Sequence, residues 1–148
     1  MFSFNKIVGR RTPERGFKKA TIYSGQSVDV GYGGGVCQVS TTIFNAALLG
    51  NLTINERYQH TMKVHYVVPG RDAAISWGTN DLKFKNSTNT DIKISAKVYN
   101  NSKIEIKLLT NSSAKHKKVT LNVKQSGDNY TLTRLVGKKV NYTTRSKY

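Results

Sequence analysis

The feature that most constrains the fold is one segment of helical period in a chain whose other segments resemble strands and turns. Residues 31–35 contain four glycines, and a helical pattern follows them. Apolar residues recur there with the spacing of one buried helix face, at Val39, Ile43, Ala46 and Ala47. Gly50 and Asn51 predict the end of this helix, because glycine readily takes the left-handed conformation that terminates helices. We therefore expect one main helix that begins directly after the glycine run.

Cys37 is the only cysteine, and it lies where this predicted helix begins. Backbone N–H groups at a helix N-terminus lack partners and form the positive end of the helix dipole. Such a position favours the thiolate and lowers the pKa of a cysteine from about 8.5 towards ~3.5–7.5. The glycines before Cys37 leave its sulfur open to close approach by a substrate. We interpret Cys37 as a nucleophile, and the alternative is a small buried thiol that only packs the helix.

Residues 1–30 carry weaker signals. Loose alternation over residues 2–8 predicts a short strand or extended arm, and Thr12 followed by Pro13 predicts the start of a short helix. Residues 22–30 predict one connecting strand that leads into the glycine run. Three arginines could hold a substrate carboxylate or could simply form a solvated face: Arg10, Arg11 and Arg15.

A histidine and an aspartate follow the predicted helix at useful spacings. Residues 61–68 alternate as a strand, with His60 in phase with its apolar face and His65 on the other face. We therefore expect His60 to be the base that meets Cys37. Asp72 follows a Pro-Gly turn, beside the hairpin that we expect residues 61–68 to form with a returning strand over residues 73–77. The alternatives are a structural or solvated histidine and a turn aspartate that caps its own backbone.

Residues 81–148 alternate apolar and polar side chains in five segments separated by Asn- and Ser-rich turns. The segments are 82–84, 92–98, 103–108, 119–123 and 130–135. They predict an antiparallel meander with lysines on its solvated face. We therefore expect an α+β fold: an antiparallel β-sheet core, one main helix that carries Cys37 at its N-terminus, and a β-rich C-terminal half. The length of 148 residues suits a single domain.

The formal net charge of +16 predicts anionic partners. Residues 81–148 hold 15 Lys and Arg against 4 Asp and Glu, a net charge of +11, and residues 1–80 contribute +5. Nucleic acid is the least favoured partner, because no binding motif accompanies the charge. A single cysteine excludes an internal disulfide framework and a multi-cysteine metal site, and we expect no metal or cofactor. No apolar run is long enough to span a membrane, and no signal segment is recognisable at Met1.

Several stretches closely resemble the VanW domain, with the string at residues 33–42 the most specific. They are residues 2–9, 12–16 and 33–42 (Gly-Gly-Gly-Val-Cys-Gln-Val-Ser-Thr-Thr), together with His60 and residues 69–73 (Pro-Gly-Arg-Asp-Ala). The resemblance covers about residues 2–110, which we take as the core of a single domain over 1–148, and it is weaker over the tail at about 111–148. VanW domains are associated with glycopeptide-resistance clusters. They usually lie outside the bacterial membrane behind an N-terminal anchor.

The resemblance implies work on peptidoglycan, the bacterial cell wall, as a cysteine-dependent L,D-transpeptidase that forms 3→3 cross-links. Cys37 would be the nucleophile, His60 the base and Asp72 its orienting partner, an order of parts also found in papain-like and transglutaminase-like enzymes. We expect substrate contacts from Gly34, Gly35, Gln38, Ser40 and Arg71. The expected partners are peptidoglycan stem peptides and anionic wall polymers, the expected location is extracytoplasmic, and the parent protein is expected to be membrane-anchored. Two alternatives stand: a thiol amidase or endopeptidase, and a non-catalytic wall-binding module.

Overall fold

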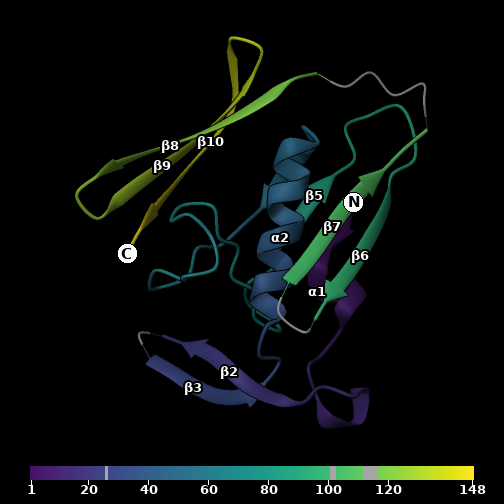
Figure 1. The fold of residues 1–148 in the computed structure, drawn as a ribbon, viewed down its shortest axis with the longest axis vertical. Helices are drawn as coiled ribbons and strands as arrows, with labels where there is room; N and C mark the ends of the chain where they lie inside the picture. The colour runs from purple at the N-terminus through teal and green to yellow at the C-terminus, as the bar shows by residue number, and fades with distance from the viewer. Residues whose placement is uncertain (26, 101–102, 112–116) are drawn as a thin grey trace.

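The computed structural model describes residues 1–25, 27–100, 103–111 and 117–148. It consists mostly of antiparallel strands with one main helix (Figure 1), so the expected α+β class is confirmed at that level. In chain order the elements are β1 (Phe2–Ser3), α1 (Phe4–Val8), the 3-10 turn η1 (Pro13–Arg15), β2 (Lys19–Ser24), β3 (Ser27–Tyr32), α2 (Val36–Leu49), β4 (Thr53–Glu56), β5 (Lys83–Lys85), β6 (Lys93–Tyr99), β7 (Lys103–Leu109), β8 (Val119–Ser126), β9 (Asn129–Val136) and β10 (Lys139–Lys147).

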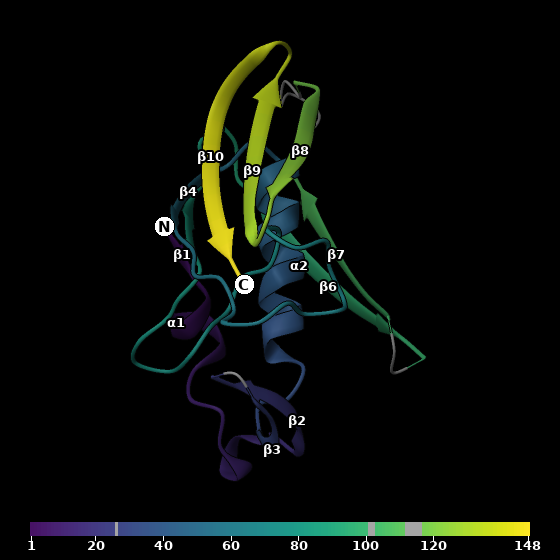
Figure 2. The same ribbon diagram turned by 90° about the vertical axis from the view of Figure 1, so that its left-hand side faces the viewer.

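Helix α2 is the centre of the fold. Its fully buried side chains include Phe44, Ala47 and Leu48, which join a core cluster with residues of the sheets. The β6–β7 hairpin packs on one side of α2 and the β8–β10 sheet on another, while the β2–β3 hairpin lies at the N-terminal end of the helix (Figures 1 and 2). The described sheets are therefore arranged around this one helix, and strands β4, β7 and β8 contact it directly.

The end of α2 corrects one prediction in detail. Gly50 caps the helix at φ −75°, and the residue in the left-handed region is Asn51 at φ 56°. Asparagine tolerates this conformation better than most residues because its short polar side chain bonds locally. The N–H of Gly50 bonds to the carbonyl of Ala46 at 2.8 Å, which closes the last turn.

The predicted meander over residues 81–148 is wrong as a single sheet. Strand β5 pairs with β1 and β4 in one sheet, β6 pairs with β7, and β8, β9 and β10 form a third, all antiparallel. The Phe2 ring stacks on the Phe84 ring at 4.4 Å, which joins the N-terminal strand to β5. Strand β10 was not predicted, because its polar side chains mask the alternation. The sequence also predicts that His116 is exposed among Lys115, Lys117 and Lys118, but Lys115 and His116 lie outside the described residues.

Two predictions near the N-terminus are also corrected. Residues 4–8 form helix α1 and not a strand, since the Ser3 side chain accepts a hydrogen bond from the N–H of Lys6 and starts a helical turn. The single strand predicted at 22–30 is two strands, β2 and β3, which pair in register from Lys19 with Tyr32 to Ser24 with Ser27. The short helix predicted after Thr12 is present as η1.

The hairpin predicted from residues 61–68 and 73–77 is wrong. Neither segment is a strand, and the bridge that Ala74 makes is to Tyr58, which lies before the first segment. The backbone around Ala73 bonds to side chains of α2 instead: its carbonyl accepts from Ser40 Oγ at 2.5 Å, and its N–H donates to Thr41 Oγ1 at 2.9 Å. These hydroxyl groups therefore bond the Ala73 N–H and carbonyl groups that would otherwise pair with a neighbouring strand.

Candidate functional site

Cys37 is the second residue of α2 and faces an open cleft of about 750 Å³. The glycine run before the helix, strand β2, Tyr66 with His65, and the stretch from Ile75 to Trp77 line this cleft. The thiol is half-buried and donates to the carbonyl oxygen of Ile75 at 3.6 Å. The sulfur therefore lies at a boundary where a ligand in the cleft can reach it.

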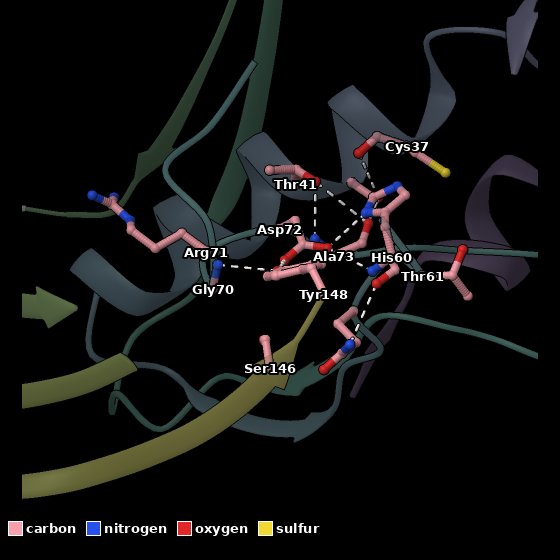
Figure 3. Close-up of polar contacts among 12 residues, drawn as sticks. Cys37, Thr41, His60, Thr61, Gly70, Arg71, Asp72, Ala73, Ser146 and Tyr148 are labelled. Atoms are coloured by element: carbon pink, nitrogen blue, oxygen red, sulfur yellow. Dashed lines mark hydrogen bonds and ion pairs between the residues drawn. The ribbon is translucent and has the colours of Figure 1, made fainter. Parts of the chain in front are cut away.

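His60 lies between Cys37 and Asp72 (Figure 3). On one side its imidazole lies close enough to the Cys37 thiol to lower the pKa of that thiol. On the other side Nδ1 lies 2.6 Å from Asp72 Oδ2, which also accepts from the backbone N–H of His60 at 2.6 Å. Tyr66 Oη lies 3.3 Å from Nε2. The three predicted residues are thus brought together in one series, in which Asp72 hydrogen-bonds His60 and His60 lies beside Cys37.

Two residues that the sequence did not point to hold Asp72, whose side chain is fully buried. Arg57 places Nη2 at 2.7 Å from Oδ1 and Nε at 2.6 Å from the Asp72 carbonyl oxygen. The Tyr148 hydroxyl donates to the same Oδ1, and Arg57 Nη1 reaches Ser146 Oγ at 2.9 Å. Because Ser146 and Tyr148 belong to the C-terminal tail, the end of the chain is part of this site (Figure 3).

These contacts set the charge states of the series. Burial alone would lower the pKa of His60, but the hydrogen bond and charge of Asp72 outweigh it and raise that pKa to about 9. Burial would raise the pKa of the Cys37 thiol, yet the hydrogen bond and charge of His60, with a contribution from Arg11, bring it below its ordinary value. Burial would also raise the pKa of Asp72, and its bonds to His60, Arg57 and Tyr148 lower it instead. The arrangement favours a thiolate beside an imidazolium.

The glycine run has two structural duties at the mouth of the cleft. A Cβ on Gly34 would lie 2.4 Å from the Cβ of Ala20 and 2.8 Å from the carbonyl oxygen of Thr21, so strand β2 packs directly on the glycine backbone. Gly35 is the N-cap at φ 83°, a left-handed conformation that disfavours other residues. Glycine is therefore needed for the β2–β3 hairpin to pack beside the Cys37 thiol, and it also leaves that thiol accessible to a ligand.

The first turn of α2 has unused N–H donors. Val36 and Val39 donate to the carbonyl oxygens of Gly33 and Gly35, both at 3.1 Å. Within the described part of the chain, the N–H groups of Cys37 and Gln38 make no hydrogen bond. They lie where the helix dipole is positive.

Of the residues predicted to contact substrate, some line the cleft and others do not. Gly34, Gly35 and Gln38 line the cleft with Cys37. Ser40 is fully buried and bonds backbone carbonyls, so it does not line the cleft. Arg71 extends away from Cys37 (Figure 3), with Nε bonded to Asn45 Oδ1 at 2.7 Å.

His65 is an exposed residue of the cleft wall, not a partner of Asp72. Its Nδ1 lies 3.0 Å from the Tyr23 hydroxyl. Tyr23 also meets the His60 and Tyr66 rings edge-on, at centroid distances of 5.8 and 6.5 Å. Burial raises the pKa of Tyr66, so its hydroxyl stays protonated next to His60. Aromatic side chains thus form part of the cleft wall near His60.

Among the described residues, no group of histidine, cysteine or acidic side chains is placed to hold a metal ion. None of the helices in the described ranges has the length and apolar character needed to cross a membrane.

The fold and site define the chain as an α+β domain with a Cys–His–Asp series at the first turn of its main helix. Comparison with family models matches residues 1–109 to the family described as "VanW like protein". The chain belongs to this VanW-like family.

Two curated relatives are also similar to this chain. "Uncharacterized protein YoaR" of Bacillus subtilis (strain 168) is 50% identical over 103 residues, which are 70% of this chain and 34% of the relative. "Vancomycin B-type resistance protein VanW" of Enterococcus faecalis (strain ATCC 700802 / V583) is 32% identical over 98 residues, 63% of this chain and 36% of the relative. The matched part thus spans about a third of the length of each relative. No solved structure matches the chain significantly.

Proposed function

We propose that this domain is a cysteine acyltransferase of the bacterial cell wall, an L,D-transpeptidase that joins peptidoglycan stem peptides. The observation that carries the proposal is the series of Cys37, His60 and Asp72 beside an open cleft, in which Asp72 hydrogen-bonds the imidazole next to the thiol. Nucleophilic thiol catalysis needs these three groups: a thiol, a base within hydrogen-bond reach, and a group that orients the base. Family membership and the named resistance relative agree with a role at the cell wall.

In the first step the Cys37 thiolate attacks the carbonyl carbon of the diaminopimelate L-centre in a donor tetrapeptide. A C–S bond forms, the C–N bond to the terminal D-alanine breaks, and the His60 imidazolium gives its proton to the leaving amine. Asp72 holds the Nδ1 side of the ring at 2.6 Å, which directs Nε2 towards the sulfur. The unused N–H groups of Cys37 and Gln38 are suited to stabilise the oxyanion that develops on the carbonyl oxygen.

In the second step an acceptor amine resolves the thioester. The amine nitrogen of a second stem peptide attacks the thioester carbonyl and passes its proton to the now neutral His60. The C–S bond breaks, the Cys37 thiolate and the His60 imidazolium return, and a 3→3 cross-link remains. Water in place of the amine would make the same site an amidase or endopeptidase. A wall-binding module without catalysis would leave the lowered thiol pKa of Cys37 without a use.

The location and further partners follow from the same proposal. We place the domain outside the cytoplasmic membrane, in a parent protein with a membrane anchor. The net charge of +16 suits binding to anionic wall polymers, with most of the excess in residues 81–148. No cofactor takes part in either step.

Intact-mass spectrometry with a peptidoglycan tetrapeptide tests the proposal. The native protein should gain the mass of the tripeptide acyl group and release D-alanine, and Cys37→Ala should do neither. With a second stem peptide present, a cross-linked dimer supports transfer, whereas free tripeptide alone supports the hydrolase. Absence of both adduct and D-alanine release in a protein with a free thiol would overturn the enzymatic proposal.

A further inference from the structure

The structure separates the three clustered arginines. Arg15 lies outside the cleft, where Nη2 donates to the carbonyl oxygen of Val8 at 3.0 Å. Arg10 and Arg11 both line the cleft that holds Cys37. Along the described cleft lining these two are the permanently charged side chains, and no aspartate or glutamate lines it. The cleft is therefore positively charged next to the thiol.

Arg11 has donors without acceptors. Its Nη1 and Nη2 atoms are buried and find no hydrogen-bond partner among the described residues. The guanidinium lies 5.6 Å from the centre of the Phe4 ring, and a Cβ on Gly33 would lie 3.0 Å from the Arg11 Cγ. The side chain thus runs along the glycine run at the start of α2. A buried cation with unmatched donors is costly, so such a group calls for an explanation.

The nearby anions do not satisfy Arg11. It is attracted by Cys37 and by Asp81 through charge alone. The Asp81 oxygens already accept from Ser3 Oγ at 2.6 Å and from the backbone N–H groups of Asn5 and Leu82. The flat fork of a guanidinium matches the two oxygens of a carboxylate, and rotation about the side-chain bonds can turn it toward an entering anion.

We propose that Arg11 binds a substrate carboxylate in the cleft beside Cys37, a role that rests on the function proposed above. A donor stem peptide offers two such groups close to the scissile bond. One is the terminal carboxylate of the leaving D-alanine, and the other is the side-chain carboxylate of the diaminopimelate residue. Binding either one would orient the scissile carbonyl on the sulfur and would make the domain select unamidated peptides.

Binding to the Cys37→Ala protein tests this without turnover. Calorimetry would compare the donor tetrapeptide with two amidated forms, one at the terminal carboxylate and one at the diaminopimelate side chain. We expect one of the amides to bind about 10- to 100-fold more weakly, the usual effect of losing a charged hydrogen-bonded pair. Adding Arg11→Gln should abolish the difference, and Arg11→Lys should keep part of it. Arg15→Gln, on the same segment but outside the cleft, should change nothing.

Each outcome decides the matter. The amide that loses affinity identifies the carboxylate that Arg11 holds. Equal binding of all three peptides, no binding at all, or a preference that survives Arg11→Gln would overturn the carboxylate site. Absence of an acyl adduct in the native protein, with the binding preference intact, would instead overturn the proposed reaction and leave the carboxylate site standing.

Discussion

Replacing Arg57 by methionine isolates the energetic role of the ion pair behind His60. The pair joins Arg57 Nη2 to Asp72 Oδ1 at 2.7 Å, and the two side chains are only 3% and 1% exposed. Methionine keeps most of the length and apolar surface of the arginine stem. The substitution therefore leaves a buried carboxylate with His60 and Tyr148 as its remaining side-chain partners.

The expected loss of free energy of unfolding follows from the burial of this ion pair. Removing one partner of a buried ion pair costs about 3–5 kcal/mol, because it leaves an uncompensated charge. The charge of His60 still faces Oδ2, so we expect the lower end, about 3 kcal/mol. For a chain of this size each kcal/mol lowers Tm by about 2–4 °C, which gives a decrease of about 6–12 °C.

Urea unfolding of matched variants measures this loss. Lys83→Met is the control, because Lys83 Nζ and Glu56 Oε2 are also 2.7 Å apart but their side chains are 38% and 25% exposed. Such exposed pairs contribute about 0–1 kcal/mol. The difference in free energy of unfolding between native protein and Arg57→Met should shrink as pH falls below 3.8. The pKa of Asp72 is lowered on folding, so the stability that its charge contributes is lost when the carboxylate is protonated. Equal losses in the two variants, or a loss below about 1 kcal/mol for Arg57→Met, would refute the reasoning.

Four further predictions concern the cleft and its supports. Cys37 should react with iodoacetamide at a pH where an ordinary thiol is mostly protonated, and His60→Ala should move the rate profile to higher pH, as measured by mass spectrometry. Turnover should decline as pH rises through about 9, where His60 loses its proton. The His60→Ala variant should form no acyl adduct, whereas His65→Ala should still form most of the adduct, and the reverse result would exclude His60 as the base. Tyr148→Phe removes one donor from a buried carboxylate and should cost about 1–2 kcal/mol in urea unfolding, whereas an unchanged value would mean that this bond is dispensable. Gly34→Ala should displace strand β2 and weaken binding of the donor peptide in calorimetry, and native affinity would show that the hairpin does not shape the cleft.

The sequence was sufficient for α2 because its pattern is local. Apolar residues at helical spacing and a glycine run define both ends to within a residue, and tertiary contacts do not override such a strong period. The alternation over residues 61–68 was equally regular but misled, since a strand also needs a partner. Here the hydroxyl groups of Ser40 and Thr41 occupy the backbone of the neighbouring segment.

The prediction that His60 is the base relied on a strand over residues 61–68 that the structure does not contain. Burial nevertheless alternates along this segment. His60 and Val64 are buried, whereas Thr61 and His65 are exposed. The predicted assignment of His60 to the buried side and His65 to the exposed side is therefore correct, although the predicted strand is not. Arg57 could not have been found in this way, because its partners Asp72 and Ser146 are 15 and 89 residues away and no spacing rule links them.

The bond from Tyr148 to Asp72 has a consequence for domain boundaries. Similarity to the family ends at residue 109, whereas the contacts that fix the aspartate extend to residue 148. A fragment cut at residue 109 would lose the whole β8–β10 sheet, including the buried Leu132 and the Arg134 guanidinium that bonds the carbonyl oxygen of Leu52 at 2.8 Å. Grafting this site into another protein, or producing it alone, therefore requires that sheet as well as the residues that resemble the family.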